Sequence, residues 1–205
     1  MKTSLTLCSA LLAALAYAAP LLAAPASVGA PAPEFSASDS KGQKHTLSEF
    51  KGKTVVLEWN NPECPFVRKH YGSGNMQKQQ ADATAAGVVW LTVNSGAKGK
   101  QGYMDGTGAD AYVKETGAKP TVYLLDADGT VGKAYGARTT PHMYVIDGQG
   151  VLRYAGGIDS VQSTDQDDIK GATQYVRQVL TELSSGKPVS VATSQPYGCS
   201  VKYGS

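Results

Sequence analysis

Two runs of apolar, largely β-branched residues, 54–59 and 88–93, constrain the fold of this chain more than any other feature. Both runs are continuous rather than alternating, which is typical of strands in a sheet that is covered on both faces. The segment between them favours a helix that begins at Pro65, breaks around residues 71–74 and resumes to about Ala86. Strand, helix and strand at this spacing predict a βαβ unit with parallel strands.

The rest of the chain continues this α/β alternation. A polar turn before the first run predicts a short hairpin, and a second hairpin is expected late in the chain. The last predicted helix has an apolar stripe from Ile169 to Leu183 and a stop at residues 186–188, so it should cover one sheet face. The expected elements are a hairpin at 35–37 and 44–47, a helix at 109–116, a strand at 121–125 and a hairpin at 144–147 and 151–155.

The first residues have the pattern of a secretory leader. Lys2 gives a basic start, residues 5–24 are nearly all Leu and Ala, and residues 24–26 form a small-residue cleavage pattern. A single membrane-spanning helix is the alternative, although Pro20 and Pro25 interrupt the end of the apolar run. We therefore expect residues 1–26 to be a signal peptide, the mature protein to be secreted or periplasmic, and no stable membrane span after its removal.

The remaining chain is of single-domain size. We predict one domain over residues 27–188 and a polar C-terminal tail over residues 189–205. Once Lys2 is removed with the leader, the 19 Lys and Arg residues nearly balance the 17 Asp and Glu residues and leave a net charge of about +1. This balance gives no indication of a nucleic-acid or membrane-surface partner.

Cys64 is the residue most suited to chemistry. It follows the first buried strand and precedes Pro65, which is tolerated at the first position of a helix. At a helix start, free backbone N–H groups and the helix dipole favour a thiolate, so Cys64 is a candidate nucleophile. The alternative is an inert, buried thiol.

Cys199 is the only other cysteine of the mature chain, because Cys8 leaves with the leader. Any intramolecular disulfide must therefore join Cys64 and Cys199. In one interpretation Cys199 is a resolving thiol on a mobile tail that reaches back to Cys64. In the other the two residues form a permanent bridge, which could stabilise the fold by roughly 5 kcal/mol because it closes a long loop.

Several features in order resemble the alkyl hydroperoxide reductase / thiol-specific antioxidant superfamily, the peroxiredoxin-like redoxins. These are the opening residues Ala32-Pro33-Glu34-Phe35, the Gly42 turn, Leu47, and Gly52-Lys53 before the first buried strand. The resemblance implies a thioredoxin-like fold, an α/β architecture with a central mixed sheet and helices on both faces. It covers nearly the whole mature chain.

The resemblance also implies site residues. Glu58 falls where thioredoxins keep a buried acid beneath the active cysteine, and such a carboxyl could shuttle the proton of the thiol. The alternative is a carboxylate at the strand end that faces solvent or pairs with Lys. Thr140-Pro141 matches the cis-proline loop that packs against the active cysteine and leaves backbone groups free for an extended substrate.

Two departures from these families bear on the reaction. The Pro-x-x-x-Thr motif before the peroxidatic cysteine of peroxiredoxins is absent, and Val67 stands where thioredoxins have their second cysteine. Peroxiredoxins also usually have an arginine at the position of Pro141. Arg68 or Arg138 could take its electrostatic role, although a surface salt bridge is the alternative use of either.

These observations predict an exported thiol-dependent oxidoreductase. Cys64 would attack a peroxide or a protein disulfide, Cys199 would resolve the product, and an external thiol reductant would regenerate both thiols. One alternative is a non-catalytic redoxin scaffold locked by a structural Cys64–Cys199 disulfide. Another is a metal-binding chaperone-like domain in which Cys64 and His142 bind copper, but the Cys-x-x-x-Cys of the related copper chaperones is absent. We expect no metal site and no cofactor.

Overall fold

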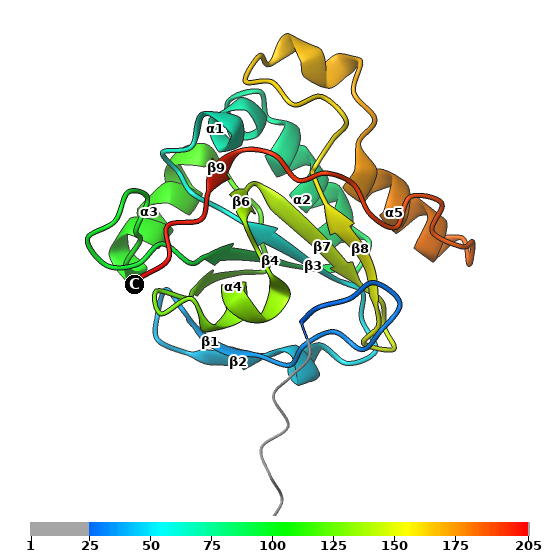
Figure 1. The fold of residues 1–205 in the computed structure, drawn as a ribbon, viewed down its shortest axis with the longest axis horizontal. Coiled ribbons are helices and arrows are strands. Elements are labelled where there is room, and N and C mark those ends of the chain that lie inside the picture. The colour runs from blue at the N-terminus through cyan, green and yellow to red at the C-terminus, as the bar shows by residue number, and fades with distance from the viewer. Residues whose placement is uncertain (1–24, 205) are drawn as a thin grey trace, which may run out of the picture.

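A seven-stranded mixed sheet forms the centre of the chain in the computed structural model, which describes residues 25–204 (Figure 1). The strand order is β2-β1-β5-β4-β3-β7-β8, with β3, β4 and β5 parallel and the other pairings antiparallel. The strands are β1 (Ser36–Asp39), β2 (Lys44–Thr46), β3 (Val55–Trp59), β4 (Val89–Asn94), β5 (Val122–Leu125), β7 (His142–Ile146) and β8 (Leu152–Gly156).

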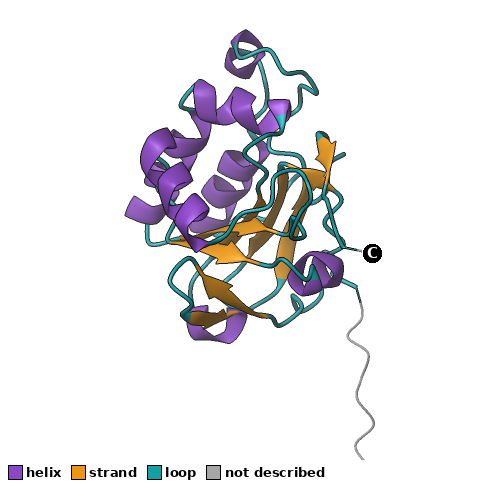
Figure 2. Cartoon of the chain, turned by 90° about the vertical axis from the view of Figure 1, so that its left-hand side faces the viewer, coloured by secondary structure: helices purple, strands orange, loops and turns teal. Residues whose placement is uncertain are grey.

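Helices cover both faces of this sheet. Most of them gather on one side, as Figure 2 shows, and their buried residues share one apolar core with Val56 of β3. On the other face, α4 packs against a second core that contains Leu57 and Trp59. The helices are α1 (Pro65–Gly72), α2 (Asn75–Ala85), α3 (Gly106–Thr116), α4 (Thr130–Tyr135) and α5 (Tyr175–Ser184), with 3-10 turns at Leu47–Phe50 and Asp167–Lys170.

The predicted βαβ unit, both hairpins and the broken helix after Cys64 are all present, so the predicted α/β architecture is confirmed. The predicted signal peptide lies outside the described residues apart from its last two. Within residues 25–204, no helix is both long and apolar enough to cross a bilayer.

Two details of the sequence-based prediction were wrong. The last helix begins at Tyr175 and not at Ile169, because a 3-10 turn ends at Gly171 and Gln174 then forms a β-bridge with Asp159. The apolar stripe before residue 175 therefore belongs to a turn. Helix α4 was not predicted; it is short, and the buried carboxylate of Asp126 accepts hydrogen bonds from two backbone N–H groups in its first turn.

The C-terminal tail lies across the end of the sheet (Figure 1, red). Its short strand β9 (Cys199–Ser200) pairs antiparallel with β6 (Thr139–Thr140), which precedes β7. Further along, the N–H of Val201 donates to the carbonyl of Arg138 at 3.0 Å. The tail is thus part of the packed structure around the end of β3.

Candidate active site

Cys64 occupies the N-cap of α1, as the sequence predicted. A tight turn joins it to β3: its N–H donates to Asn61 O at 3.1 Å, and the Asn61 side chain accepts the N–H of Glu63 at 2.9 Å. The Cys64 carbonyl accepts from Arg68 N, which closes the first helical turn. The residue has 0% solvent exposure, so the sulfur combines a helix start with complete burial.

The loop before β7 brings the second cysteine to the first. The Thr140–Pro141 peptide bond is cis, which confirms that prediction. The Cys64 thiol donates to the carbonyl oxygen of Thr140 at 3.0 Å, and Thr140 is the register partner of Cys199 in the β6–β9 pair. Cys199 is therefore a neighbour of Cys64, and both cysteines are free thiols.

The two thiols differ in acidity. Burial acts to raise the pKa of Cys64, but hydrogen bonds from the side chains of Cys199 and Thr140 and from the backbone N–H of Val67 outweigh it and lower that pKa below its usual value. Burial and the neighbouring Cys64 raise the pKa of Cys199 to about 11. Cys64 is therefore the thiol that ionises first, with the Cys199 thiol as one of its donors.

Gly198 permits this arrangement. Its φ is +129°, a value that L side chains rarely adopt, and an added Cβ would lie 2.0 Å from the carbonyl oxygen of Thr140. Only glycine therefore allows the tail backbone to approach the Thr140–Pro141 loop this closely.

Glu58 is buried, with 0% exposure, so the solvent-facing alternative for this residue is excluded. It alternates with Leu57 and Trp59 along β3 and faces the layer of α1 and α2. Burial raises the pKa of its carboxyl group, although hydrogen bonds oppose the shift. Five side chains donate to the carboxylate: Asn60 at 3.3 Å, Tyr71 at 2.8 Å, Gln80 at 3.0 Å, Trp90 at 2.8 Å and Thr92 at 3.1 Å.

Cys64 is not among the donors to Glu58. Two of the donors, Tyr71 and Trp90, belong to the same core cluster as Cys64. Sequence reasoning missed these donors. Thr92, inside the otherwise apolar strand β4, was the available signal, because a buried hydroxyl needs a partner.

The remaining candidates do not join the thiols. His142 is buried, and burial together with Arg138 lowers its pKa to about 3, so it is neutral. Arg68 is exposed, and its Nε donates to the carbonyl of Pro62 at 3.0 Å rather than to a sulfur. Across residues 25–204, no three His, Cys, Asp or Glu side chains are placed to hold a metal ion together.

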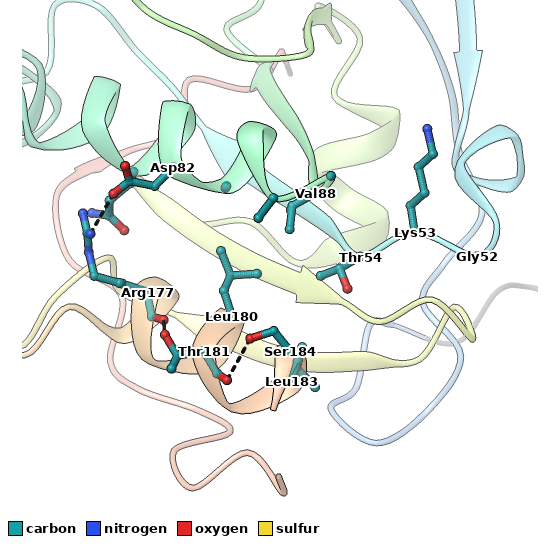
Figure 3. A pocket seen from close by; sticks show the side chains of 14 residues that line it. Gly52, Lys53, Thr54, Asp82, Val88, Arg177, Leu180, Thr181, Leu183 and Ser184 are labelled. Atoms are coloured by element: carbon teal, nitrogen blue, oxygen red, sulfur yellow. Dashed lines mark hydrogen bonds and ion pairs between the residues drawn. The ribbon is translucent and has the colours of Figure 1, made fainter. Parts of the chain in front are cut away.

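A groove of about 570 Å³ lies between α2 and α5, where Asp82 and Arg177 form an ion pair at 2.8 Å (Figure 3). One wall includes Thr54, immediately before the amino end of β3. Cys64 follows the carboxyl end of that strand, and none of the candidate residues lines the groove. The groove is therefore separate from the thiol site.

The sequence matches the AhpC/TSA family over residues 28–155, a segment that contains β1 to β7, Glu58, Cys64 and Pro141. The chain belongs to the AhpC/TSA family. Among curated proteins, this redoxin is 30% identical over 116 residues to the thiol-disulfide oxidoreductase ResA of Geobacillus kaustophilus. That match covers 51% of the chain and 66% of ResA, just under two thirds of the relative's length.

Several solved structures share the fold of this chain. An uncharacterized conserved protein from Geobacillus kaustophilus superposes on this redoxin with a TM-score of 0.76 at 26% identity, covering 87% of this chain and 93% of that one. A hypothetical protein from Sinorhizobium meliloti gives a TM-score of 0.73 at 25% identity, covering 87% and 96%. The thioredoxin domain of a thiol-disulfide oxidoreductase from Bacteroides vulgatus gives 0.52 at 18% identity, covering 71% and 96%. The predicted thioredoxin-like fold is confirmed.

Proposed function

We propose that this redoxin is a thiol–disulfide oxidoreductase in which Cys64 is the nucleophile and Cys199 the resolving thiol. One observation carries the proposal: the β6–β9 pairing holds Cys199 next to Cys64, whose thiol lies at a helix start and has a lowered pKa. The similarity to ResA, whose name describes this chemistry, supports it.

The reaction follows from the two acidities. The Cys64 thiolate attacks one sulfur of a substrate disulfide, and the substrate S–S bond breaks. One substrate sulfur leaves as a thiolate and takes up a proton from solvent. Cys199 then loses its proton and attacks the Cys64 sulfur, which releases the second substrate thiol and leaves a Cys64–Cys199 disulfide. An external dithiol reduces this bond and becomes oxidised in turn.

Substrate access requires movement of the tail. Because Cys64 is fully covered in the reduced structure, a protein substrate must displace β9 before it reaches the sulfur. Displacement also frees the backbone of Thr139 and Thr140, which an extended substrate segment could pair with in place of Cys199 and Ser200. Glu58 is proposed as the buried acid that exchanges protons with the site.

Hydrogen peroxide is the less favoured oxidant. Its reduction needs donors for the leaving oxygen, whereas Pro141 stands at the position of the usual arginine and Arg68 is engaged at Pro62. We also propose that residues 1–26 direct export, so that the thiol pair works outside the cytoplasm, where disulfides persist.

Single-turnover reaction with a disulfide substrate tests the proposal. Mature protein, reduced and desalted, is mixed with insulin as a protein disulfide, and the products are trapped with acid and mapped by mass spectrometry. We expect Cys64–Cys199 disulfide in the wild type, a trapped Cys64–substrate mixed disulfide in Cys199→Ser, and neither in Cys64→Ser. Hydrogen peroxide is the second arm. If the wild type forms no Cys64–Cys199 bond with either oxidant, the proposal is contradicted. If it reacts faster with hydrogen peroxide than with insulin, peroxide and not a protein disulfide is the substrate.

A further inference from the structure

A cluster of buried ionisable side chains lies directly behind the tail. It consists of Lys69 and His70 of α1, Asp159 of the loop after β8, and Tyr197 of the tail, with exposures of 1%, 0%, 1% and 6%. We call these four residues the tail latch. No part of the proposed redox chemistry uses them, although a buried carboxylate and a buried ammonium are expensive to maintain.

Tyr197 is the member that belongs to the tail. Its hydroxyl donates to Asp159 Oδ1, and His70 Nε2 lies 3.3 Å from the same hydroxyl oxygen. The other oxygen, Asp159 Oδ2, makes no hydrogen bond and faces Lys69 Nζ and His70 Nε2, each at 3.8 Å. Because burial lowers the pKa of His70 to about 4, that ring is neutral and Lys69 supplies the compensating charge.

Lys69 is itself held in place by the same loop. Its ammonium donates to Val161 O at 3.0 Å and to Ser163 Oγ at 3.3 Å. It also lies 6.0 Å from the centroid of the Tyr197 ring, which is within cation–π range. Withdrawal of the tail would therefore take from Asp159 its one tyrosine donor and leave the buried charges with fewer partners.

The latch is close to the thiols along both chain segments. Tyr197 precedes Cys199 by two residues, with Gly198 between them. On the other side, the ring of Tyr197 packs edge-on against Phe66, 5.8 Å between centroids, and Phe66 follows Cys64 by two residues. The Tyr197 side chain thus joins the tail near Cys199 to the start of α1 near Cys64.

We propose that Tyr197 and Asp159 are positioning residues that hold the tail closed over Cys64, so that their contact sets both the access of substrate to Cys64 and the speed with which Cys199 resolves the mixed disulfide. This inference rests on the proposed function. If the tail latch is loosened, the rates of the two half-reactions should change in opposite directions. A loosened latch exposes Cys64 more often and accelerates attack, while it lowers the effective concentration of Cys199 and slows resolution.

Stopped-flow reaction with dithiobis(nitrobenzoate), a small chromogenic disulfide, separates the two steps. Attack by Cys64 releases one nitrothiobenzoate and forms the mixed disulfide; attack by Cys199 on the Cys64 sulfur releases the second. We expect Tyr197→Phe to raise the rate of the first release about tenfold, equivalent to about 1.4 kcal/mol, and to slow the second by a similar factor. Asp159→Asn should shift both rates in the same directions.

Tyr135→Phe is the matched control, because Tyr135 is also buried and its hydroxyl donates at 2.7 Å to Pro33 O, which is not a tail residue. It should leave both release rates unchanged, whatever its effect on the melting temperature. Unchanged rates in Tyr197→Phe, or two rates that fall together, would overturn the latch. A wild type that releases only one equivalent refutes the proposed Cys64–Cys199 function instead, so the two failures are distinguishable.

Discussion

Thr140 pairs with Cys199 across β6 and β9, and the carbonyl oxygen of the same Thr140 accepts the thiol of Cys64 at 3.0 Å. Thr140 therefore contacts the sulfur of Cys64 and the backbone of Cys199. The contact with Cys64 favours the neutral thiol, since a thiolate has no proton to donate. The donors around Cys64 outweigh it, because its pKa is lowered despite burial.

The order of ionisation can be measured directly. Residue-resolved alkylation of the reduced protein by iodoacetamide, followed by mass spectrometry across pH 5–10 (roughly the range in which protein thiols titrate), should give a lower apparent pKa for Cys64 than for Cys199. The normalised pH profile carries this information, because tail opening limits the absolute rate at Cys64. Equal midpoints for the two thiols contradict the proposed roles.

The high pKa of Cys199 should depend on its neighbour. Three causes together raise the pKa of Cys199 to about 11: burial first, then the hydrogen bond with Cys64 and the charge of Cys64. In Cys64→Ser the charge is absent, so the alkylation midpoint of Cys199 should move downward towards the ordinary thiol value. A midpoint that stays where it is in the wild type would show that burial alone sets it.

Gly198→Ala should open the tail. The new Cβ would meet the Thr140 carbonyl oxygen at 2.0 Å, and the backbone at φ +129° is strained for alanine. We expect alkylation of Cys64 to accelerate at least about tenfold, the factor that corresponds to about 1.4 kcal/mol lost from the closed tail.

Gly186→Ala is the control for backbone strain, because Gly186 has φ +67° and nothing within 4 Å of an added Cβ. That variant should lose some stability without any acceleration at Cys64. Similar Cys64 alkylation in both variants would mean that general loosening, and not the contact with Thr140, exposes the sulfur.

The buried carboxyl of Glu58 should make stability depend on pH. Its folded pKa is raised above the ordinary 4.5, so the fold favours the protonated form. Its stabilising contribution is full below pH 4.5 and is lost as the pH rises through the folded pKa, by about 1.4 kcal/mol for each unit of separation between the two pKa values.

Glu58→Gln removes this titration. Denaturant unfolding between about pH 4 and pH 8 should therefore show a flatter dependence of the unfolding free energy on pH in the variant than in the wild type. Parallel curves would contradict the raised pKa. The test uses the pH dependence and not the absolute stability of the variant. The glutamine NH₂ group would face donors that now bind the carboxylate oxygens, so the variant should also lose stability by an amount that does not depend on pH.

Local sequence signals correctly predicted that Cys64 lies at a helix start. The continuous run before Trp59 and the proline after Cys64 were enough to predict a sulfur at a helix start, because a buried strand and a first-turn proline are local preferences. Thr140-Pro141 was predicted as a cis bond from the family resemblance, and the structure contains it. Helix α5 was predicted too long, since the apolar spacing of Ile169 continued through a glycine that ends a turn.

The α/β scaffold and the position of Cys64 after β3 were predictable from the sequence, because patterns of a few residues encode strands, turns and helix starts. The proximity of Cys199 to Cys64, the five donors around Glu58 and the contact of Tyr197 with Asp159 became visible in the folded chain alone. Most of these contacts join residues that lie 22 or more positions apart in the sequence. The energy of each contact depends on whether its polar groups are removed from water. Which groups are buried depends on the packing of the whole chain.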